Sequence, residues 1–339
     1  MKRQLRVVFL TPPPHQKVPW EHDVISAIDP RHELVLFDPF KPLEAQFAKA
    51  DVVIDFGGNR GTRAMADASQ TVKLWQILGT GFDHFDLSYW RSKRIPVANC
   101  PGQFSAIPLA ECALMYILML ARRWDETQEN LRAGILYTPI GLELDGQQLG
   151  LIGFGASARE LARRARGFGM RIAAIDVREI PTEEKELYAL DFVGKPADMD
   201  RVIAESDFVS LHLHLNQETR GIMNERRLRL MKPSAHLINV ARGALVDERA
   251  LCQVLQEGKL AGAGLDVFEV EPPDPANLLL TMPNVVATPH ISGLTHGTSR
   301  RRAACAAQNI ERVAEGLDPL YRIEAMPAPE MAPVDSPTS

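Results

Sequence analysis

A strand that ends at two glycines and continues as a helix is the feature that most constrains how this chain can fold. The apolar run from Leu149 to Ile152 leads into Gly153 and Gly155. Apolar residues then recur at helical spacing, at Leu161, Ala162, Ala165 and Phe168. A second strand, Arg171 to Ile175, ends at Asp176. This order predicts a strand–helix–strand unit that turns at the glycines.

The unit has the spacing of a dinucleotide-binding site. Gly153 permits the tight turn, and Gly155 lets the backbone approach a pyrophosphate at the helix N-terminus. Ala158 stands where a third glycine often does, and it is small enough for the helix to pack on the strand. Asp176 can accept hydrogen bonds from ribose hydroxyls, which favours NAD over NADP. Arg178 weakens this preference, because an arginine there can meet a 2′-phosphate.

Composition is that of an ordinary water-soluble protein of two domains. The chain has 339 residues, of which 45% are hydrophobic and 24% charged. A net charge of −5 with interspersed signs gives no broad basic field, so we expect no nucleic-acid partner. The basic clusters Arg163–Arg164 and Arg300–Arg302 lie on expected helices. We interpret them as solvated faces, with phosphate or partner contacts as the alternative.

Cysteine usage and hydropathy favour a cytoplasmic protein. Four cysteines are scattered without a CxxC spacing, and the N-terminus MKRQLRVVFL leads straight into a strand rather than a signal peptide. The longest apolar stretch, Leu109–Ala121, contains Glu111 and is too short to cross a bilayer, so we expect no membrane contact. His212 and His214 share a strand face, but no third ligand stands at a convincing spacing, and we expect no metal.

The remaining chain predicts alternating strands and helices. Five early strands are expected at Arg6–Leu10, His32–Phe37, Asp51–Phe56, Leu74–Leu78 and Ile95–Ala98, and four later ones at Phe208–His212, Leu237–Val240, Gly264–Val267 and Val285–Ala287. This pattern predicts parallel α/β layers. One long helix is expected from Ser105, its N-cap, to Gly134, with Pro108 in its first turn. A last helix, Thr298–Glu315, precedes Gly316 and a Pro-rich tail expected to be disordered.

At this point the chain resembles the D-isomer-specific 2-hydroxyacid dehydrogenase family, which includes D-lactate, glycerate, hydroxypyruvate and 3-phosphoglycerate dehydrogenases. The resemblance covers roughly residues 50 to 316. It is carried by the phrases LGTGFDHFDL, PLAECALMYILMLAR, LGLIGFG, SDFVSLHLHLNQETRGIMNERRLRLMKPSAHLINVARGALVDERAL, GAGLDVFEVEP and NVVATPHISG. It implies an NAD(H)-dependent oxidoreductase that transfers hydride between nicotinamide and a small 2-oxo or 2-hydroxy acid of D configuration.

The resemblance also implies an architecture. Two Rossmann-like parallel-sheet domains are expected, with the nucleotide-binding domain inserted into the catalytic domain and the substrate between them. Residues 1–101 and 298–322 would form the catalytic, substrate-binding domain, residues 102–297 the NAD-binding domain, and residues 323–339 the tail. The helix after Ser105 resembles the family's dimer element, so a homodimer is expected.

Three residues meet the chemical needs of such a reduction. His290 is the candidate acid, because imidazole can give and take a proton near neutral pH. Glu271, if paired with it, stabilises the imidazolium. Arg242 follows a strand, and its planar guanidinium matches a carboxylate in two bonds. Each residue also has a structural alternative. Arg242 could form a surface ion pair, Glu271 could be an acid in a turn, and His290 could be a packed histidine.

The family resemblance implies further contacts. Cofactor-binding residues are expected to be Thr80, Gly153, Gly155, Ala156, Ser157, Asp176, His212, Leu213, Val240, Arg242, Asp266 and His290. Substrate-binding residues are expected to be Phe56, Gly57, Gly58 and Arg242, while Arg60 and Arg63 either hold a phosphate or second carboxylate or face water. Asp266 has a buried structural role as its alternative.

Departures from the family pattern leave other functions open. His214 and Asn216 replace a common proline and threonine, and Ala156 replaces a common arginine, so cofactor contacts are expected to differ. The chief alternative function is an NAD-sensing, corepressor-like binding protein on the same fold, which keeps the same arginine, glutamate and histidine. A structural role with a vestigial cofactor site is the third.

Overall fold

A computed structural model describes residues 3–11, 20–57 and 60–323. The chain divides into two compact units. The first comprises Met1–Pro101 and Ser299–Ser339, and the second comprises Gly102–Thr298. Of the expected tail, Ile323 still belongs to the fold, since its N–H donates to the carbonyl of Val97 at 2.8 Å. The rest of that tail lies outside the described residues.

The first unit is built on a five-stranded sheet. Its order is β2 (Glu33–Leu36), β1 (Arg6–Leu10), β3 (Val52–Asp55), β4 (Leu74–Ile77) and β5 (Val97–Ala98). Every pairing between neighbours is parallel. All five strands were expected from apolar runs, and four are a residue or two shorter than those runs. The prediction of a parallel α/β layer is therefore confirmed here.

Both faces of this sheet are covered. The helices are α1 (Trp20–Ala27), α2 (Leu43–Phe47), α3 (Arg63–Ala68), α4 (Leu87–Ser92) and the end of α12 (His296–Ala314). Val7 and Phe9 of β1 pack on one face with Ile310 of α12, whereas Val8 and Leu10 pack on the other with the aromatic cluster around Trp90. Strands buried on both faces need the continuous apolar runs that the sequence has.

The second unit contains a seven-stranded sheet. Its order is β12 (Val285–Ala287), β11 (Gly262–Leu265), β10 (His236–Asn239), β9 (Phe208–Leu211), β6 (Gln148–Ile152), β7 (Arg171–Ile175) and β8 (Phe192–Gly194). All pairings are parallel. Successive strands are added to one side of β6 and then, from β9, to the other. In open α/β sheets ligands bind at such a reversal point, outside the carboxyl ends of the strands.

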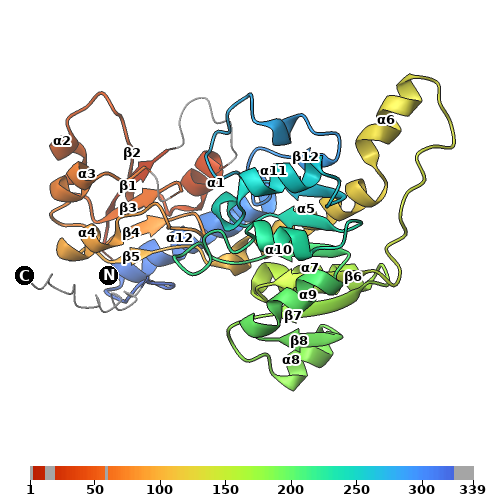
Figure 1. Ribbon diagram of the computed structural model, residues 1–339. Helices are drawn as coiled ribbons and strands as arrows, with labels where there is room; N and C mark the ends of the chain where they lie inside the picture. The colour runs from red at the N-terminus through yellow and green to blue at the C-terminus, as the bar shows by residue number, and fades with distance from the viewer. Residues whose placement is uncertain (1–2, 12–19, 58–59, 324–339) are drawn as a thin grey trace, which may run out of the picture. The chain divides into compact units, whose positions relative to one another are not determined.

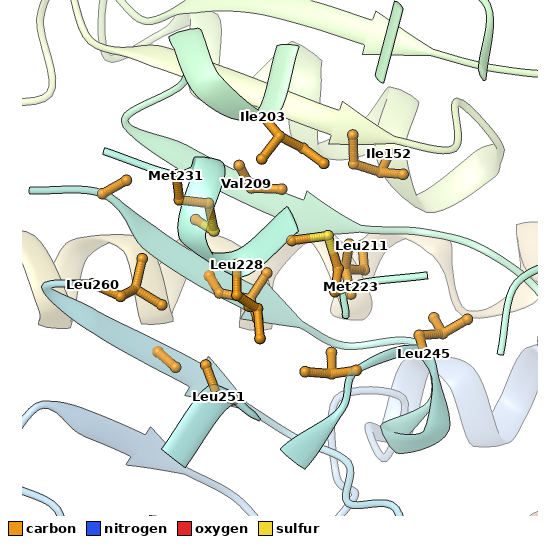
Figure 2. Close-up of a cluster of buried hydrophobic side chains, with 14 of the residues drawn as sticks. Ile152, Ile203, Val209, Leu211, Met223, Leu228, Met231, Leu245, Leu251 and Leu260 are labelled. Atoms are coloured by element: carbon orange, nitrogen blue, oxygen red, sulfur yellow. The ribbon is translucent and has the colours of Figure 1, made fainter. Parts of the chain in front are cut away.

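Helices cover this sheet on both faces too. One face carries α5 (Ala106–Ala121) and α7 (Ala156–Arg166). The other carries α9 (Met199–Glu205), α10 (Glu225–Leu230) and α11 (Glu248–Gln256). Figure 2 shows this second layer, where Leu228 and Leu251 pack with Val209 and Leu211 of β9. The short helix α8 (Thr182–Leu187) lies near β8 at the sheet edge (Figure 1).

The prediction of one long helix from Ser105 to Gly134 is wrong in one respect, because the chain forms two helices there. It ends at Ala121, and α6 (Trp124–Arg132) begins after Arg123, whose φ is +48°. The physical reason is the change in composition: α5 buries its apolar face on the sheet, whereas α6 buries no residue. Ser105 does stand at the N-cap, but its side chain makes no capping hydrogen bond.

Two smaller differences concern helix ends. Helix α7 ends at Arg166, so Phe168, expected on its apolar face, lies beyond it and is exposed. Helix α12 begins at His296, two residues before the expected start, and ends at Ala314. No helix in the described part of the chain is long and apolar enough to span a membrane.

Candidate active site

The glycine turn leads from β6 into α7. Gly153 has φ +90°, and a Cβ there would stand 2.6 Å from the carbonyl oxygen of His212, so only glycine lets β6 and β9 approach here. A Cβ on Gly155 would meet nothing within 4 Å. No side chain caps the N-terminus of α7. Open space beside free helix N–H groups fits a pyrophosphate.

Asp176 follows the second strand of this unit and faces the turn. Its Oδ2 accepts the N–H of Phe154 at 2.7 Å, and its Oδ1 accepts the N–H of Arg178 at 2.9 Å. Each carboxylate oxygen has a second lone pair, which suits ribose hydroxyls. The acid therefore both fixes the turn and presents acceptor positions where the sequence places the ribose.

His212 stands at the carboxyl end of β9, opposite the glycine turn. Its Nδ1 lies 2.9 Å from the hydroxyl of Ser157 and its Nε2 2.9 Å from that of Ser210. Burial lowers the pKa of His212 to about 3, so the ring is neutral. Because both nitrogens are engaged with serines, the metal pair considered for His212 and His214 has no geometric support. Among the described residues, no group of three His, Cys, Asp or Glu side chains is placed to hold a metal ion.

Arg242 lies just after β10, at the same edge of the sheet. Asn239, the last residue of β10, holds it: the amide of Asn239 donates to the carbonyl of Arg242 at 2.8 Å and accepts the N–H of Ala241 at 3.1 Å. Gly243 then passes so close to Phe268 that a Cβ would stand 1.9 Å from its carbonyl carbon. The close approach brings the Arg242 turn against the segment that leads to Glu271.

Glu271 and His290 form a direct pair. Oε2 of Glu271 lies 2.7 Å from Nδ1 of His290, and Oε1 accepts the N–H of Phe268 at 3.1 Å. Burial raises the pKa of Glu271, but the His290 bond, the His290 charge, the Phe268 N–H and Arg242 outweigh it, and the net shift is downward. Glu271 is therefore a carboxylate at neutral pH. Nε2 of His290 has no hydrogen-bond partner among the described residues, and the side chain is about half exposed.

Asp266 is fully buried at the end of β11, and it builds the loop that carries His290. Its Oδ1 accepts the Thr288 hydroxyl at 2.6 Å and the Ile291 N–H at 2.7 Å, and its Oδ2 accepts the Ser292 N–H at 2.8 Å. The Thr288 hydroxyl also hydrogen-bonds Tyr116 of α5. The backbone of His290, with φ +54°, donates to the carbonyl of Asp266 at 2.8 Å. The structural role kept as an alternative for Asp266 is thus present.

Glu248 at the start of α11 was not singled out from the sequence. Its Oε1 accepts the N–H of Glu269, two residues before Glu271, and its Oε2 accepts the amide of Asn277 at 3.3 Å. Burial raises the pKa of Glu248, with further contributions from the charges of Glu269 and Glu271. This carboxylate ties α11 to the loop that carries Glu271. Glutamate is common in the first turn of a helix, so the sequence gives no sign of this role. The role follows from the contact with Glu269, which is distant in sequence.

The expected substrate loop belongs to the first unit and is held by another residue that the sequence analysis missed. Asp55, fully buried at the end of β3, accepts the N–H of Gly61 at 2.9 Å and the indole N–H of Trp75 at 3.2 Å. The same carboxylate accepts the N–H of Gly57 at 3.3 Å. Phe56 packs its ring 4.9 Å from that of Trp20. Gly58 lies outside the described residues.

Two more expected contacts also lie in the first unit. Thr80 accepts a hydrogen bond from the guanidinium of Arg302 at 3.1 Å, and Arg302 lies 4.7 Å over the Trp20 ring. Arg63 donates to Asp86 at 2.9 Å on the surface, which favours the solvent-facing alternative for that arginine. The second unit thus brings together Arg242, Glu271, His290 and Asp266, whereas Phe56, Gly57 and Thr80 are positioned by the first.

Comparison with known proteins agrees with this geometry. Residues 114–292 match the family model described as D-isomer specific 2-hydroxyacid dehydrogenase, NAD binding domain. A glyoxylate reductase of Thermococcus litoralis is 35% identical over 309 residues, which is 87% of this chain and 91% of that protein. The chain belongs to the D-isomer specific 2-hydroxyacid dehydrogenase family. The predictions of this family and of an oxidoreductase are confirmed.

Other relatives of this family extend the comparison. A hydroxypyruvate reductase of Thermotoga maritima is 38% identical over 257 residues, covering 75% of this chain and 81% of that protein. The crystal structure of the TT0316 protein from Thermus thermophilus superposes with a TM-score of 0.77 at 33% identity, covering 94% of this chain and 100% of that one. The predicted fold class, two parallel-sheet α/β domains, is likewise confirmed.

The remaining residues that were expected to affect cofactor binding have defined places in the second unit. The amide oxygen of Asn216 accepts the N–H groups of Glu218 and Thr219, both at 2.9 Å, and so closes a turn. Ala156 begins α7 beside the open space at Gly155. Leu213 packs against the core of the second unit and Val240 is buried in it.

Proposed function

We propose that this protein reduces a small 2-oxo acid to its D-2-hydroxy acid with NADH, and that Arg242, Glu271 and His290 carry the reaction. The observation that supports this most directly is the Glu271–His290 pair at 2.7 Å on the same sheet edge as Arg242. A histidine held by a carboxylate, with an arginine nearby, provides both a proton and a cation for an acid with a ketone beside its carboxylate.

His290 supplies the proton in this proposal. Its Nδ1 is held by Glu271, so the proton transferred to the substrate carbonyl oxygen comes from Nε2. Glu271 stabilises the charged imidazolium before transfer, because an opposite charge at hydrogen-bond distance favours the protonated form. In the reverse direction the same nitrogen accepts the proton of the hydroxyl group. Asp266 keeps the ring in place through the backbone of its loop.

Arg242 orients the substrate. Its guanidinium presents parallel N–H donors that match the carboxylate of a 2-oxo acid, and its charge polarises the adjacent carbonyl. The turn is fixed by Asn239 and by the contact between Gly243 and Phe268, so the donors need little rearrangement. The Phe56–Gly57 loop, which Asp55 holds in place, is proposed to lie against the same carboxylate.

The nucleotide site is proposed at the glycine turn. Bound NADH supplies the hydride. The open space at Gly155 and the uncapped start of α7 fit the pyrophosphate, and Asp176 fits the ribose hydroxyls. Ser157, His212, Leu213, Val240 and Thr80 are proposed as further contacts. A carboxylate at the ribose repels a 2′-phosphate, so NAD(H) is proposed over NADP(H).

The substrate is proposed to be short, such as glyoxylate or hydroxypyruvate. The relatives named above are a glyoxylate reductase and a hydroxypyruvate reductase. Arg63, which could have received a second anionic group, is already paired with Asp86. This pairing occupies one of the two arginines considered for a second anionic group, Arg60 being the other, and so favours a substrate with a single carboxylate. The cytoplasmic location expected from the sequence remains a prediction.

A homodimer is proposed to form through α6 and the chain that follows it. This segment extends away from the rest of the second unit (Figure 1). It exposes a run of large apolar side chains, Leu131, Leu136, Tyr137 and Ile140. Exposed apolar surface of this extent marks an interaction site. A second copy is the proposed occupant, since the helix after Ser105 resembles the family's dimer element.

Oxidation of NADH at 340 nm by the purified protein tests the proposal. Glyoxylate, hydroxypyruvate, pyruvate, phenylpyruvate, 2-oxoglutarate and phosphohydroxypyruvate are compared, each with NADH and with NADPH. Turnover of the short acids is expected, with little on phosphohydroxypyruvate. Tight NADH binding without any turnover would instead favour the NAD-sensing binding protein, and a pull-down with peptide partners would then follow.

A further inference from the structure

Glu184 of α8 holds two arginines beside the proposed ribose site. Its Oε1 lies 2.7 Å from Nη2 of Arg178, its Oε2 lies 2.8 Å from Nη1 of the same residue, and Nε of Arg159 lies 2.5 Å from Oε1. The Glu184 side chain is only 16% exposed. These contacts form a bidentate carboxylate–guanidinium pair with a second cation on the same carboxylate. Such pairs are among the strongest that side chains make.

Both arginines start from positions next to the nucleotide turn. The N–H of Arg178 binds Oδ1 of Asp176 at 2.9 Å, and its guanidinium also donates to the carbonyl of Phe154, inside the turn, at 2.9 Å. Arg159 lies in the first turn of α7, the helix whose N-terminus faces the open space at Gly155. Any phosphate carried on the ribose 2′-oxygen beside Asp176 would therefore lie within the field of two guanidinium groups.

We propose that Glu184 determines the cofactor specificity of this protein, by holding Arg159 and Arg178 so that neither can bind a 2′-phosphate. The inference rests on the proposed nucleotide site. With Glu184 present, the charges of the two arginines are matched by those of Asp176 and Glu184, and a phosphate would have to displace a carboxylate from Arg178. Without Glu184, two arginines face one aspartate, and the local charge favours the phosphate.

The energetic basis is the difference between the two carboxylates. Asp176 accepts two backbone N–H groups, which it keeps when ribose hydroxyls approach, and its contact with the guanidinium of Arg178 is long, at 3.9 Å. Glu184 holds the guanidinium groups themselves, and the hydrogen bond from Arg178 keeps the pKa of Glu184 low, so it stays ionised. Removing Glu184 leaves the NAD contacts intact while releasing the cations. Helix α8 has no buried residue, so its loss of one side chain should not affect the core.

Fluorescence titration of NADH and NADPH, a binding measurement that needs no turnover, tests the inference on wild type, Glu184→Ala and Glu184→Gln. Wild type is expected to bind NADH more tightly. In Glu184→Ala we expect the Kd for NADPH to fall by about tenfold or more, because charge-assisted bonds to phosphate become available. The Kd for NADH should change by less than about threefold. Glu184→Gln, which keeps the shape but not the charge, should give part of the effect.

Two further variants identify the cause. Glu257→Ala removes another glutamate that pairs with an arginine, Arg229, on the surface of the same unit, and should leave both affinities unchanged. The double variant Arg178→Ala with Glu184→Ala should lose the gain in NADPH binding and keep NADH binding. Unchanged NADPH affinity in both Glu184 variants, with normal NADH binding, overturns the inference alone. A wild type that prefers NADPH also overturns it, while failure to bind either cofactor overturns the proposed function with it.

Discussion

Gly243 passes so close to Phe268 that a methyl group on its α-carbon would stand 1.9 Å from the Phe268 carbonyl carbon. Gly243 does not have a positive φ, so alanine is excluded there by the lack of space alone. Gly243→Ala should therefore separate the Arg242 turn from the Glu271 loop. We expect a loss of about 1–3 kcal/mol in the free energy of unfolding. We also expect a fall of about 100-fold in kcat/KM for the reductase. Thermal unfolding and steady-state assays measure the two.

Gly155→Ala is the matched comparison for this steric argument. A Cβ at Gly155 meets nothing within 4 Å, and the backbone, at φ −84° and ψ −164°, accepts alanine. The unfolding temperature of the protein without cofactor should be unchanged. The Kd for NADH, however, should rise by about tenfold or more, because the methyl group occupies the space proposed for the pyrophosphate. A variant with normal NADH affinity would place the pyrophosphate elsewhere.

The strands and the strand-end residues could be predicted from the sequence because each depends on a local pattern. Apolar runs located β1 and β3, and glycines located the turn after β6. What could not be predicted is where buried carboxylates point. Asp55 and Asp266 look like any acid at a strand end, yet each accepts N–H groups from the loop after its own or a neighbouring strand. Their partners depend on strand order, which spacing does not give.

The break in the helix after Ala121 shows the same limit. The apolar pattern of α5 continues into a polar stretch that still has good helix formers, so propensity alone predicts one helix. The chain turns because α6 buries no side chain and Arg123 adopts φ +48°. In the same way, the ion pairs of Glu184 with Arg159 and Arg178 join α7, α8 and the end of β7. The proximity of these three segments follows only from the folded sheet.

Buried histidine makes the stability of the second unit depend on pH. Burial lowers the pKa of His236 from 6.5 to about 4, so the folded state keeps the ring neutral. Between these values the unfolded chain binds the extra proton, and stability falls as the pH falls. At pH 5.5 we expect the neutral ring to cost about 1 kcal/mol relative to pH 7.5.

In the wild type the rings of His236 and Phe208 are stacked, with centroids 5.0 Å apart and an interplanar angle of 14°. His236→Phe removes the titrating group and keeps a ring stacked on Phe208. The unfolding temperature of wild type should fall between pH 7.5 and 5.5 by about 2–4 °C more than that of the variant. Scanning calorimetry at the two pH values gives the comparison. Equal losses in both proteins would show that His236 does not take part.

The apolar segment after α6 should control assembly. Leu136 is 63% and Ile140 87% exposed in the single chain. Changing both to glutamate places two charges in the proposed dimer contact, so the protein should become a monomer in sedimentation experiments. Leu187→Glu alters an equally exposed side chain on α8 and should leave the dimer intact. A double variant that sediments like wild type would exclude this segment as the contact.

Glu271 and His290 should contribute unequally to the rate of reduction. Burial raises the pKa of Glu271, but the His290 bond and nearby charges outweigh it, so Glu271 is ionised at neutral pH. Glu271→Gln keeps the hydrogen bond but removes the charge that favours the imidazolium. We expect kcat/KM at neutral pH to fall by about tenfold in this variant, because the imidazolium loses its opposite charge. His290→Asn should instead lose about 100-fold or more of kcat at every pH, because no proton donor remains. Equal losses of kcat in Glu271→Gln and His290→Asn, measured by steady-state kinetics at neutral pH, would contradict this division of roles.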